Sequence, residues 1–282
     1  MLKLKKTLDR FYREFDFKGR ITHDPIEFPH RYSDPEDIEV AAFISACFAY
    51  GRVDLFKPVI ERILKSGAQH PAEFIGSFSL KKDSKYLEGI SYRFNKGKDI
   101  LCLIYIMSKA MEKYGSLQGL FYSHYEASHN DIKDALTGFV EFMTAIDTTP
   151  IYGKNIRPLG LKQLLPSPET GSACKRMNLF LRWVVRAGDI DFGIWDRVAP
   201  SKLIIPLDTH IARISRCLGL SSRKSPDWKM AKEITESLKN LDPQDPLKYD
   251  FALCHQGISG LCNGIKSSQK CSDCSLLPEN SA

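Results

Sequence analysis

The chain has 282 residues, of which 43% are hydrophobic and 26% charged, so it can form one large or two modest domains with a substantial core. This excludes a small disulfide-stapled protein, and the composition excludes a disordered segment or a fibre. Forty Lys and Arg against thirty-four Asp and Glu give a net charge of +6, which weakly favours a polyanionic partner. The charged N-terminus lacks an apolar signal segment, and the densest apolar run, 100–107, is too short to span a bilayer. We therefore expect a cytoplasmic protein with no membrane partner.

Helix signals dominate the sequence. Ser33, Asp34 and Pro35 form a typical helix start, and the apolar stretch that follows predicts a helix ending near Gly51. Apolar residues recur at three- and four-residue spacing in further segments, which we predict to be helical: 99–113, 132–145, 175–187, 228–238 and 249–258. No stretch combines sustained two-residue alternation with hairpin turn pairs, so we expect an all-α chain.

The eight cysteines are the first candidates for chemistry. In a chain without an export signal they should be reduced thiols, so a cluster of cysteines indicates metal ligation or redox chemistry. Four of them lie within residues 254–274.

Asp189 and Asp191 lie in a Gly-flanked insert, where we expect loop carboxylates rather than a metal pair.

The segment around Asp208 is the most informative. Asp208, Thr209 and His210 precede the apolar residues of a helix that also carries Arg213. Aspartate is among the best N-cap residues, so capping alone explains this pattern as well as chemistry does. A second segment favours chemistry over capping alone. Lys175 lies near the start of another predicted helix, and it is followed three positions later by Asn and then by aliphatic residues.

These two segments, together with residues 43–63 and the cysteine-containing tail, occur in the order found in a known superfamily. The chain resembles the helix-hairpin-helix DNA glycosylases, which include endonuclease III and the 8-oxoguanine DNA glycosylases. The resemblance implies an all-α, two-lobed fold with the active site in a cleft between the lobes. It implies three parts: residues 1–52, whose helices pack on the C-terminal lobe, residues 53–171, which form the middle lobe, and residues 172–282, which carry the catalytic segments and the tail.

The resemblance also implies an activity in base excision repair of DNA. Lys175 would be the amine that attacks the sugar C1′ and forms a Schiff base, which permits strand cleavage at the abasic site. The positive end of the helix dipole favours the neutral amine at that position. Asp208 would stabilise the cationic sugar and assist proton movement. Thirty-three positions separate the two residues, close to the arrangement in archaeal 8-oxoguanine glycosylases, so an oxidised base resembling 8-oxoguanine is the expected substrate.

The expected partner is double-stranded DNA that contains a damaged base. Tyr50 or Arg52 would fill the gap left by a flipped base. The sequence LPSPETG at residues 165–171 departs from the Leu-Pro-Gly-x-Gly hairpin of endonuclease III, so phosphate binding through a glycine hairpin is not expected. The residues that we expect to contact DNA are Tyr50, Arg52, Arg176, His210, Arg213, Lys266 and Lys270.

The tail resembles the iron–sulfur segment of many of these enzymes. Cys262, Cys271 and Cys274 are three candidate ligands of a 4Fe-4S cluster, and Cys254 would supply the fourth thiolate from the preceding helix. The interval from Cys262 to Cys271 holds eight residues where the family has six, and Asn280 occupies the expected position of the fourth cysteine. Zinc, or no metal at all, remains an alternative.

Two other functions remain open at this stage. The altered hairpin permits a non-catalytic protein that binds DNA or RNA on a glycosylase scaffold. The tail cysteines permit a redox or sensor protein built around a metal cluster. In each case we expect a monomer, associated with the nucleoid if the source is bacterial.

Overall fold

The computed structural model describes residues 2–67, 69–262, 264, 271 and 274–276. Lys266 and Lys270 lie outside the described residues, so their predicted DNA contacts stay predictions. Short 3₁₀ turns occur at Ile21–His23, Pro25–Glu27, Pro29–Arg31, Ser84–Leu87, Pro168–Thr170 and Pro200–Lys202. The helices are α1 (Leu2–Glu14), α2 (Phe17–Arg20), α3 (Pro35–Phe48), α4 (Val53–Lys65), α5 (Pro71–Gly76), α6 (Leu80–Asp83), α7 (Gly97–Tyr114), α8 (Leu117–Tyr122), α9 (Lys133–Ala145), α10 (Thr149–Tyr152), α11 (Leu159–Leu164), α12 (Lys175–Val185), α13 (Thr209–Cys217), α14 (Trp228–Lys239) and α15 (Asp250–Ile258).

The expected all-α class is confirmed, with one small addition. The strands β1 (Ala187–Gly188) and β2 (Asp191–Phe192) form an antiparallel hairpin directly after α12. Gly188 has φ +107° and Asp189 has φ +56°, so the turn uses backbone conformations that glycine and aspartate tolerate best. Strands of two residues are too short for side-chain alternation to reveal them in the sequence.

Most predicted helix starts are correct because their caps are local. The Asp34 carboxylate accepts hydrogen bonds from the backbone N–H groups of Glu36 and Asp37, and the Asp227 carboxylate accepts one from Met230. The last helix differs: α15 begins at Asp250, with no side-chain cap at Tyr249. The longer helix predicted over 175–187 ends at Val185, because the chain there turns into the hairpin.

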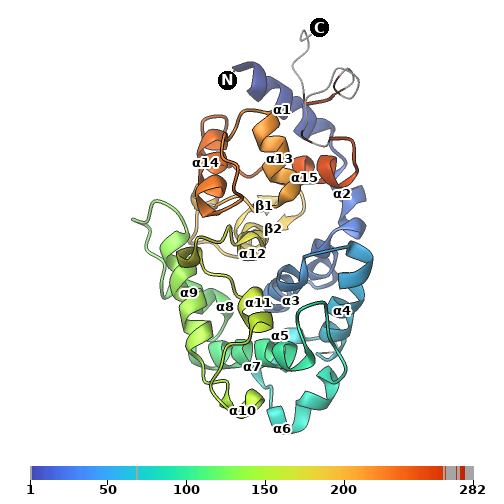
Figure 1. The fold of residues 1–282 in the computed structure, drawn as a ribbon, viewed down its shortest axis with the longest axis vertical. Helices are drawn as coiled ribbons and strands as arrows, with labels where there is room; N and C mark the ends of the chain where they lie inside the picture. Colours follow the sequence, from blue (N-terminus) through green and yellow to red (C-terminus); the bar gives the residue numbers. More distant parts are fainter. Residues whose placement is uncertain (1, 68, 263, 265–270, 272–273, 277–282) are drawn as a thin grey trace.

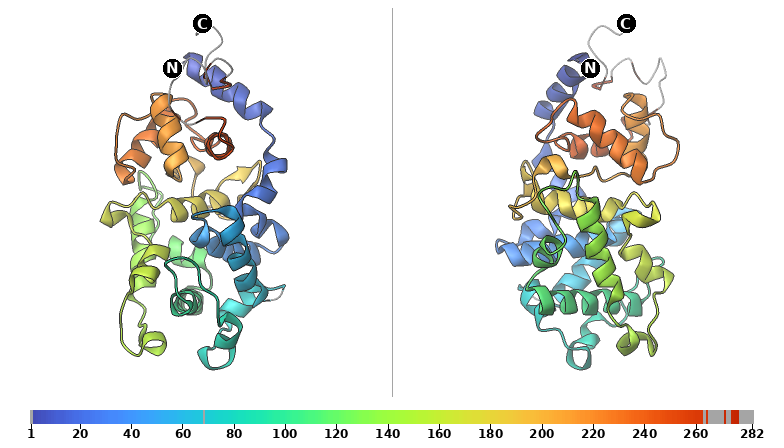
Figure 2. Two further views of the ribbon diagram at one scale, coloured as in Figure 1. Left: turned by 45° about the vertical axis from the view of Figure 1, so that its right-hand side comes forward. Right: turned by 90° about the vertical axis from the view of Figure 1, so that its left-hand side faces the viewer.

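Two groups of helices lie at opposite ends of the molecule (Figure 1). The helices α1, α13, α14 and α15 form one end, and α4 to α11 form the other. Between them α3 packs on α12 and also contacts α4, α5 and α8 (Figure 2). Within the first 52 residues, α1 lies beside the C-terminal helices and α3 packs on α12. The division of the chain into three parts stays a prediction. No helix among the described residues combines the length and the apolarity needed to cross a membrane.

A buried ionic network holds α12 to its neighbours. Arg182 donates to Asp191 at 3.0 Å and to Asp250 at 2.8 Å, and Arg186 donates to Asp191 at 2.9 Å and to Asp245 at 2.8 Å. The expectation that Asp191 is a loop carboxylate is wrong, because Asp191 lies in β2 and its side chain is fully buried between the two arginines. The network joins the end of α12 to the hairpin and to the start of α15.

Candidate functional site

A cavity of about 700 Å³ opens between the two groups of helices. Its walls come from the starts of α12 and α13, from α15, from the loop after α3 and from the segment that precedes α3. Residues predicted from the sequence to carry chemistry or to contact DNA line it together, namely Tyr50, Arg52, Lys175, Arg176, Asp208, His210 and Cys254. The structure thus brings together residues that lie up to 204 positions apart in the chain, the separation of Tyr50 and Cys254.

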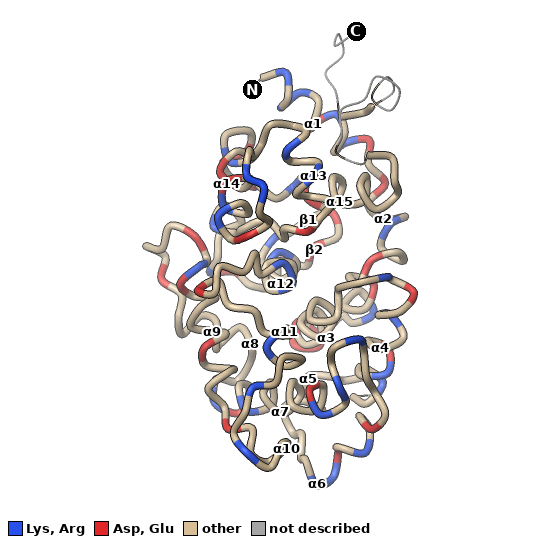
Figure 3. The backbone as a smooth tube through the Cα atoms, viewed as in Figure 1, with Lys and Arg blue, Asp and Glu red and all other residues tan. Residues whose placement is uncertain are grey.

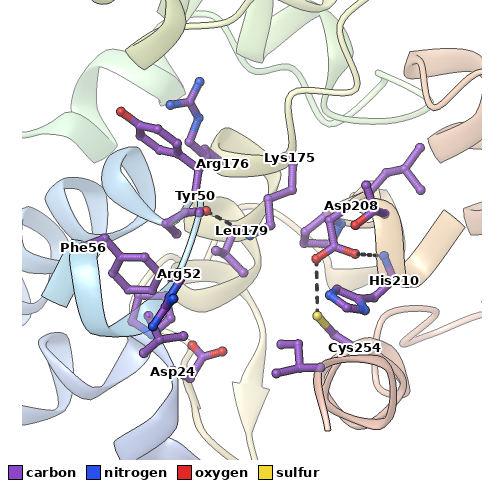
Figure 4. Close-up of a pocket in the computed structure, with 18 of the residues that line it drawn as sticks. Asp24, Tyr50, Arg52, Phe56, Lys175, Arg176, Leu179, Asp208, His210 and Cys254 are labelled. Carbon is purple, nitrogen blue, oxygen red and sulfur yellow. Dashed lines mark hydrogen bonds between the residues drawn. The ribbon is translucent and has the colours of Figure 1, made fainter. Parts of the chain in front are cut away.

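Lys175 is the first residue of α12 and lies in the middle of the cavity wall (Figure 4). Its Nζ donates a hydrogen bond to the backbone oxygen of Ala49 at 3.2 Å. The preceding residue, Cys174, has φ +48°, and this left-handed turn directs the chain into the helix. The fully buried Asn178 donates through Nδ2 to the oxygen of Ala173 at 3.0 Å, which fixes the same turn.

Asp208 both caps α13 and faces the cavity. Its Oδ1 accepts hydrogen bonds from the backbone N–H groups of His210 at 2.8 Å and Ile211 at 2.9 Å. Its Oδ2 accepts from the Cys254 thiol at 3.5 Å, as Figure 4 shows. Capping and chemistry are therefore not exclusive here, because each uses a different carboxylate oxygen.

Cys254 connects α15 to both candidate catalytic residues. Burial, followed by the carboxylates of Asp208 and Asp250, raises the pKa of the Cys254 thiol well above its ordinary value, while Lys175 acts in the opposite direction. The thiol is therefore protonated at neutral pH and can donate to Asp208.

The two predicted wedge residues, Tyr50 and Arg52, differ in their contacts and in their exposure to solvent. Tyr50 is held in place, since its hydroxyl donates to the Tyr92 oxygen at 3.2 Å and also to the Asn95 side chain. The guanidinium of Arg176 lies 5.1 Å from the Tyr50 ring centroid. Arg52 projects from the cavity rim with 77% of its side chain exposed, paired with Asp54 at 2.7 Å. Arg52 is thus the more accessible of the two candidates.

Several cavity residues, among them Phe94 and Asp250, were not predicted from the sequence. Phe94 lines the cavity although 57% of it is exposed, and the Arg93 guanidinium lies 5.6 Å from its ring centroid. Asp250 is buried in the lining, and burial raises its pKa to about 6 while Arg182 opposes this effect. Its Oδ1 has no hydrogen-bond partner in the described part of the chain. Phe94 lies in a turn, where no hydrophobic periodicity predicts the position of a side chain. Asp250 looked in the sequence like an ordinary acidic residue in the first turn of an apolar helix.

The other predicted site residues that the structure describes lie outside the cavity. Arg213 is on the solvent side of α13, where its Nε donates to the Thr209 oxygen at 3.0 Å. Cys262, Cys271 and Cys274 are partly buried, but no group of three or more His, Cys, Asp or Glu side chains capable of holding a metal occurs among the described residues. With the Cys254 thiol directed at Asp208, the described contacts do not assemble the expected four-cysteine site, which stays a prediction.

Comparison with known proteins gives one match. A family model described as "Protein of unknown function (DUF2400)" covers residues 24–259, which include α3 to α15 and both catalytic candidates and exclude α1 and α2. No curated protein and no solved structure matches the chain.

Proposed function

The chain belongs to DUF2400, a family of proteins of unknown function, and we propose that it is a DNA glycosylase with an associated lyase activity. The proposed reaction removes an oxidised base, of the 8-oxoguanine type, from duplex DNA. The observation that carries the proposal is the presence of Lys175 and Asp208, each at the start of a different helix, in one cavity. Figure 4 shows both residues among the side chains that line the cavity.

The size and lining of the cavity suit a single extruded nucleotide. A volume of about 700 Å³ lies within the range of small-ligand sites. Phe56 and Phe251 contribute aromatic surface to the lining, which suits the faces of a base. A base within a duplex is inaccessible to an amine in the wall of this cavity. The target nucleotide therefore has to rotate out of the base stack before the reaction.

Lys175 supplies the nucleophile in the proposed reaction. Its neutral amine attacks the sugar C1′ while the C1′–N bond breaks, and the base leaves with the electron pair of that bond and takes up a proton. The attached nitrogen gives one proton to the departing base, and its lone pair then opens the C1′–O4′ bond to form a protonated imine with C1′, while O4′ takes up a proton from solvent. Loss of a C2′ proton expels the 3′ phosphate, and water finally hydrolyses the imine and releases Lys175.

Asp208 stabilises the positive charge that develops on the sugar as the base departs. Its Oδ2 is the oxygen that serves this role, because Oδ1 accepts two backbone N–H groups of α13. The Cys254 thiol, which donates to Oδ2 at 3.5 Å, holds the carboxylate toward the cavity. A single oxygen of the Asp208 carboxylate is thus oriented by a neutral donor.

The rim suits duplex DNA. Arg52 and Arg176 contribute positive charge next to the cavity, and His210 adds further polar contact. The exposed Phe94 presents an aromatic ring that can stack on a base, in addition to the Arg52 wedge predicted from the sequence.

One contact favours a second candidate, a protein that binds DNA without cleaving it. The hydrogen bond from Lys175 Nζ to the Ala49 oxygen gives the lysine a structural partner that links α12 to the loop after α3. If that is its whole role, Lys175 positions the loop and performs no chemistry.

Borohydride trapping separates the two candidates. The protein is incubated with duplexes that carry 8-oxoguanine, an oxidised pyrimidine, uracil or an abasic site, and borohydride then reduces any imine to a stable covalent link. We expect a trapped complex with wild type and with Lys229→Gln, which removes an exposed lysine of α14, and none with Lys175→Gln. Binding of DNA without product or trapped complex from any duplex would refute the catalytic proposal in favour of the binding protein.

A further inference from the structure

A groove of about 400 Å³ lies along α13, beside the 700 Å³ cavity, which is called the cleft below. Thr209 lines both the groove and the cleft, so the two meet one residue from Asp208. The groove is lined by Thr209, Ala212, Arg213, Arg216, Lys224 and Pro226. Three of its six lining residues are cations and none is a carboxylate.

The positive charge of this groove is not neutralised within the described chain. Arg213 donates to the Thr209 oxygen and its Nη2 also contacts His210 Nδ1 at 3.4 Å, whereas Arg216 donates to the Lys224 oxygen. No ion pair joins Arg213, Arg216 or Lys224 to a carboxylate described in the structure. The neighbouring acidic residues are already engaged: Asp227 pairs with Arg223 at 2.8 Å, and Glu233 accepts from the Ser222 N–H at 3.2 Å. The remaining N–H donors of the exposed guanidinium groups are therefore available to an anion.

The spacing of these groups suits a linear polyanion rather than a single ion. Thr209, Arg213 and Arg216 lie four and three positions apart on one face of α13, and they span about 10 Å of helix. One strand of B-form DNA carries two or three phosphates over that length. Arg216 donates to the Lys224 oxygen at 3.2 Å and so holds the third cation next to the row. Figure 3 shows basic positions on both α13 and α14 at this end of the molecule.

We propose that this groove binds the phosphodiester backbone of a DNA duplex, next to the nucleotide whose base enters the cleft. The inference rests on the proposed function for the occupant of the cleft. Thr209, shared by both cavities, marks where the strand passes from the cleft to the groove. The contacts are to phosphates, so they position the duplex and carry no sequence preference.

The salt dependence of DNA binding tests this proposal. Affinity for an undamaged duplex is measured by fluorescence anisotropy between about 50 and 200 mM salt. The test protein carries Arg213→Gln, Arg216→Gln and Lys224→Gln. The control carries Lys65→Gln, Lys81→Gln and Lys109→Gln, which remove the same net charge from α4, α6 and α7 at the opposite end of the molecule. We expect the slope of log affinity against log salt to become shallower by about two to three in the test protein. The control should keep a slope close to that of wild type.

Further variants guard against a folding defect. Lys224→Gln alone changes one exposed loop residue and should lower the slope by about one. Arg213→Lys with Arg216→Lys keeps both charges and should keep the wild-type slope. Equal slopes in the test and control proteins would overturn the proposal, as would tighter binding of single-stranded RNA than of duplex DNA. A slope change without any trapped complex would support the groove and refute the lyase chemistry.

Discussion

At the scale of single residues, Asp208 combines two roles that a single substitution can separate. Asparagine caps helices about as well as aspartate but carries no charge. We expect Asp208→Asn to keep the thermal stability of wild type and to reduce base excision by at least about 100-fold. Asp208→Ala should lose the activity and also about 1 kcal/mol of stability. Thermal unfolding and single-turnover excision are measured on both variants, and an Asp208→Asn protein with near-normal excision would show that the carboxylate is only a cap.

Cys254 offers a second residue-scale prediction, because its thiol is the donor to the cavity oxygen of Asp208. Cys254→Ala removes that donor, and we expect excision to slow about fivefold, the equivalent of one hydrogen bond. Cys254→Ser keeps a hydroxyl donor and should recover most of the rate. Equal rates in the Ala and Ser variants, at unchanged DNA affinity, would show that the thiol does not orient Asp208.

At the scale of secondary structure elements, the start of α12 depends on a buried side chain. Asn178 donates to the Ala173 oxygen across the left-handed turn that delivers Lys175 to the cavity. Asn178→Ala removes the donor inside the core, and we expect a loss of about 1–3 kcal/mol of unfolding free energy together with weaker trapping. The matched control is Asn240→Ala, at the exposed end of α14. Urea denaturation measures the stability, and a loss in the control as large as in the Asn178 variant would contradict this role.

The elements also show what the sequence could and could not predict. The helices α7, α9 and α14 were predicted because their apolar spacing and caps are local features. Lys175 and Asp208 were expected in one site because their two segments occur in the order found in the glycosylase superfamily, and both residues line the same cavity. The ion pair between Arg182 and Asp250 could not be predicted, since it joins residues 68 positions apart and depends on how α12 packs on α15.

At the scale of the whole molecule, Glu39 joins three segments of the central core. Its carboxylate accepts from the backbone N–H groups of Leu117 at 2.8 Å and Gln118 at 2.9 Å, and from the Trp195 indole at 2.9 Å. The side chain is buried, and burial raises its pKa from 4.5 to about 7 in spite of these three donors. The core on which both ends of the molecule pack therefore contains a carboxyl group that titrates near neutral pH.

The direction of the resulting pH dependence follows from linkage. Between pH 4.5 and 7 the folded protein holds the Glu39 proton and the unfolded chain has released it, so stability is lost as the pH rises through this range. The glutamine in Glu39→Gln cannot titrate. We therefore expect the free energy of unfolding of this variant, relative to that of wild type, to rise by roughly 1 to 3 kcal/mol between pH 5 and 8. Urea denaturation followed by tryptophan fluorescence measures both proteins across this range. The control, Glu112→Gln, changes an exposed glutamate of α7 and should run parallel to wild type. A Glu39→Gln curve that also ran parallel to wild type would show that the three N–H donors keep Glu39 ionised in the folded core.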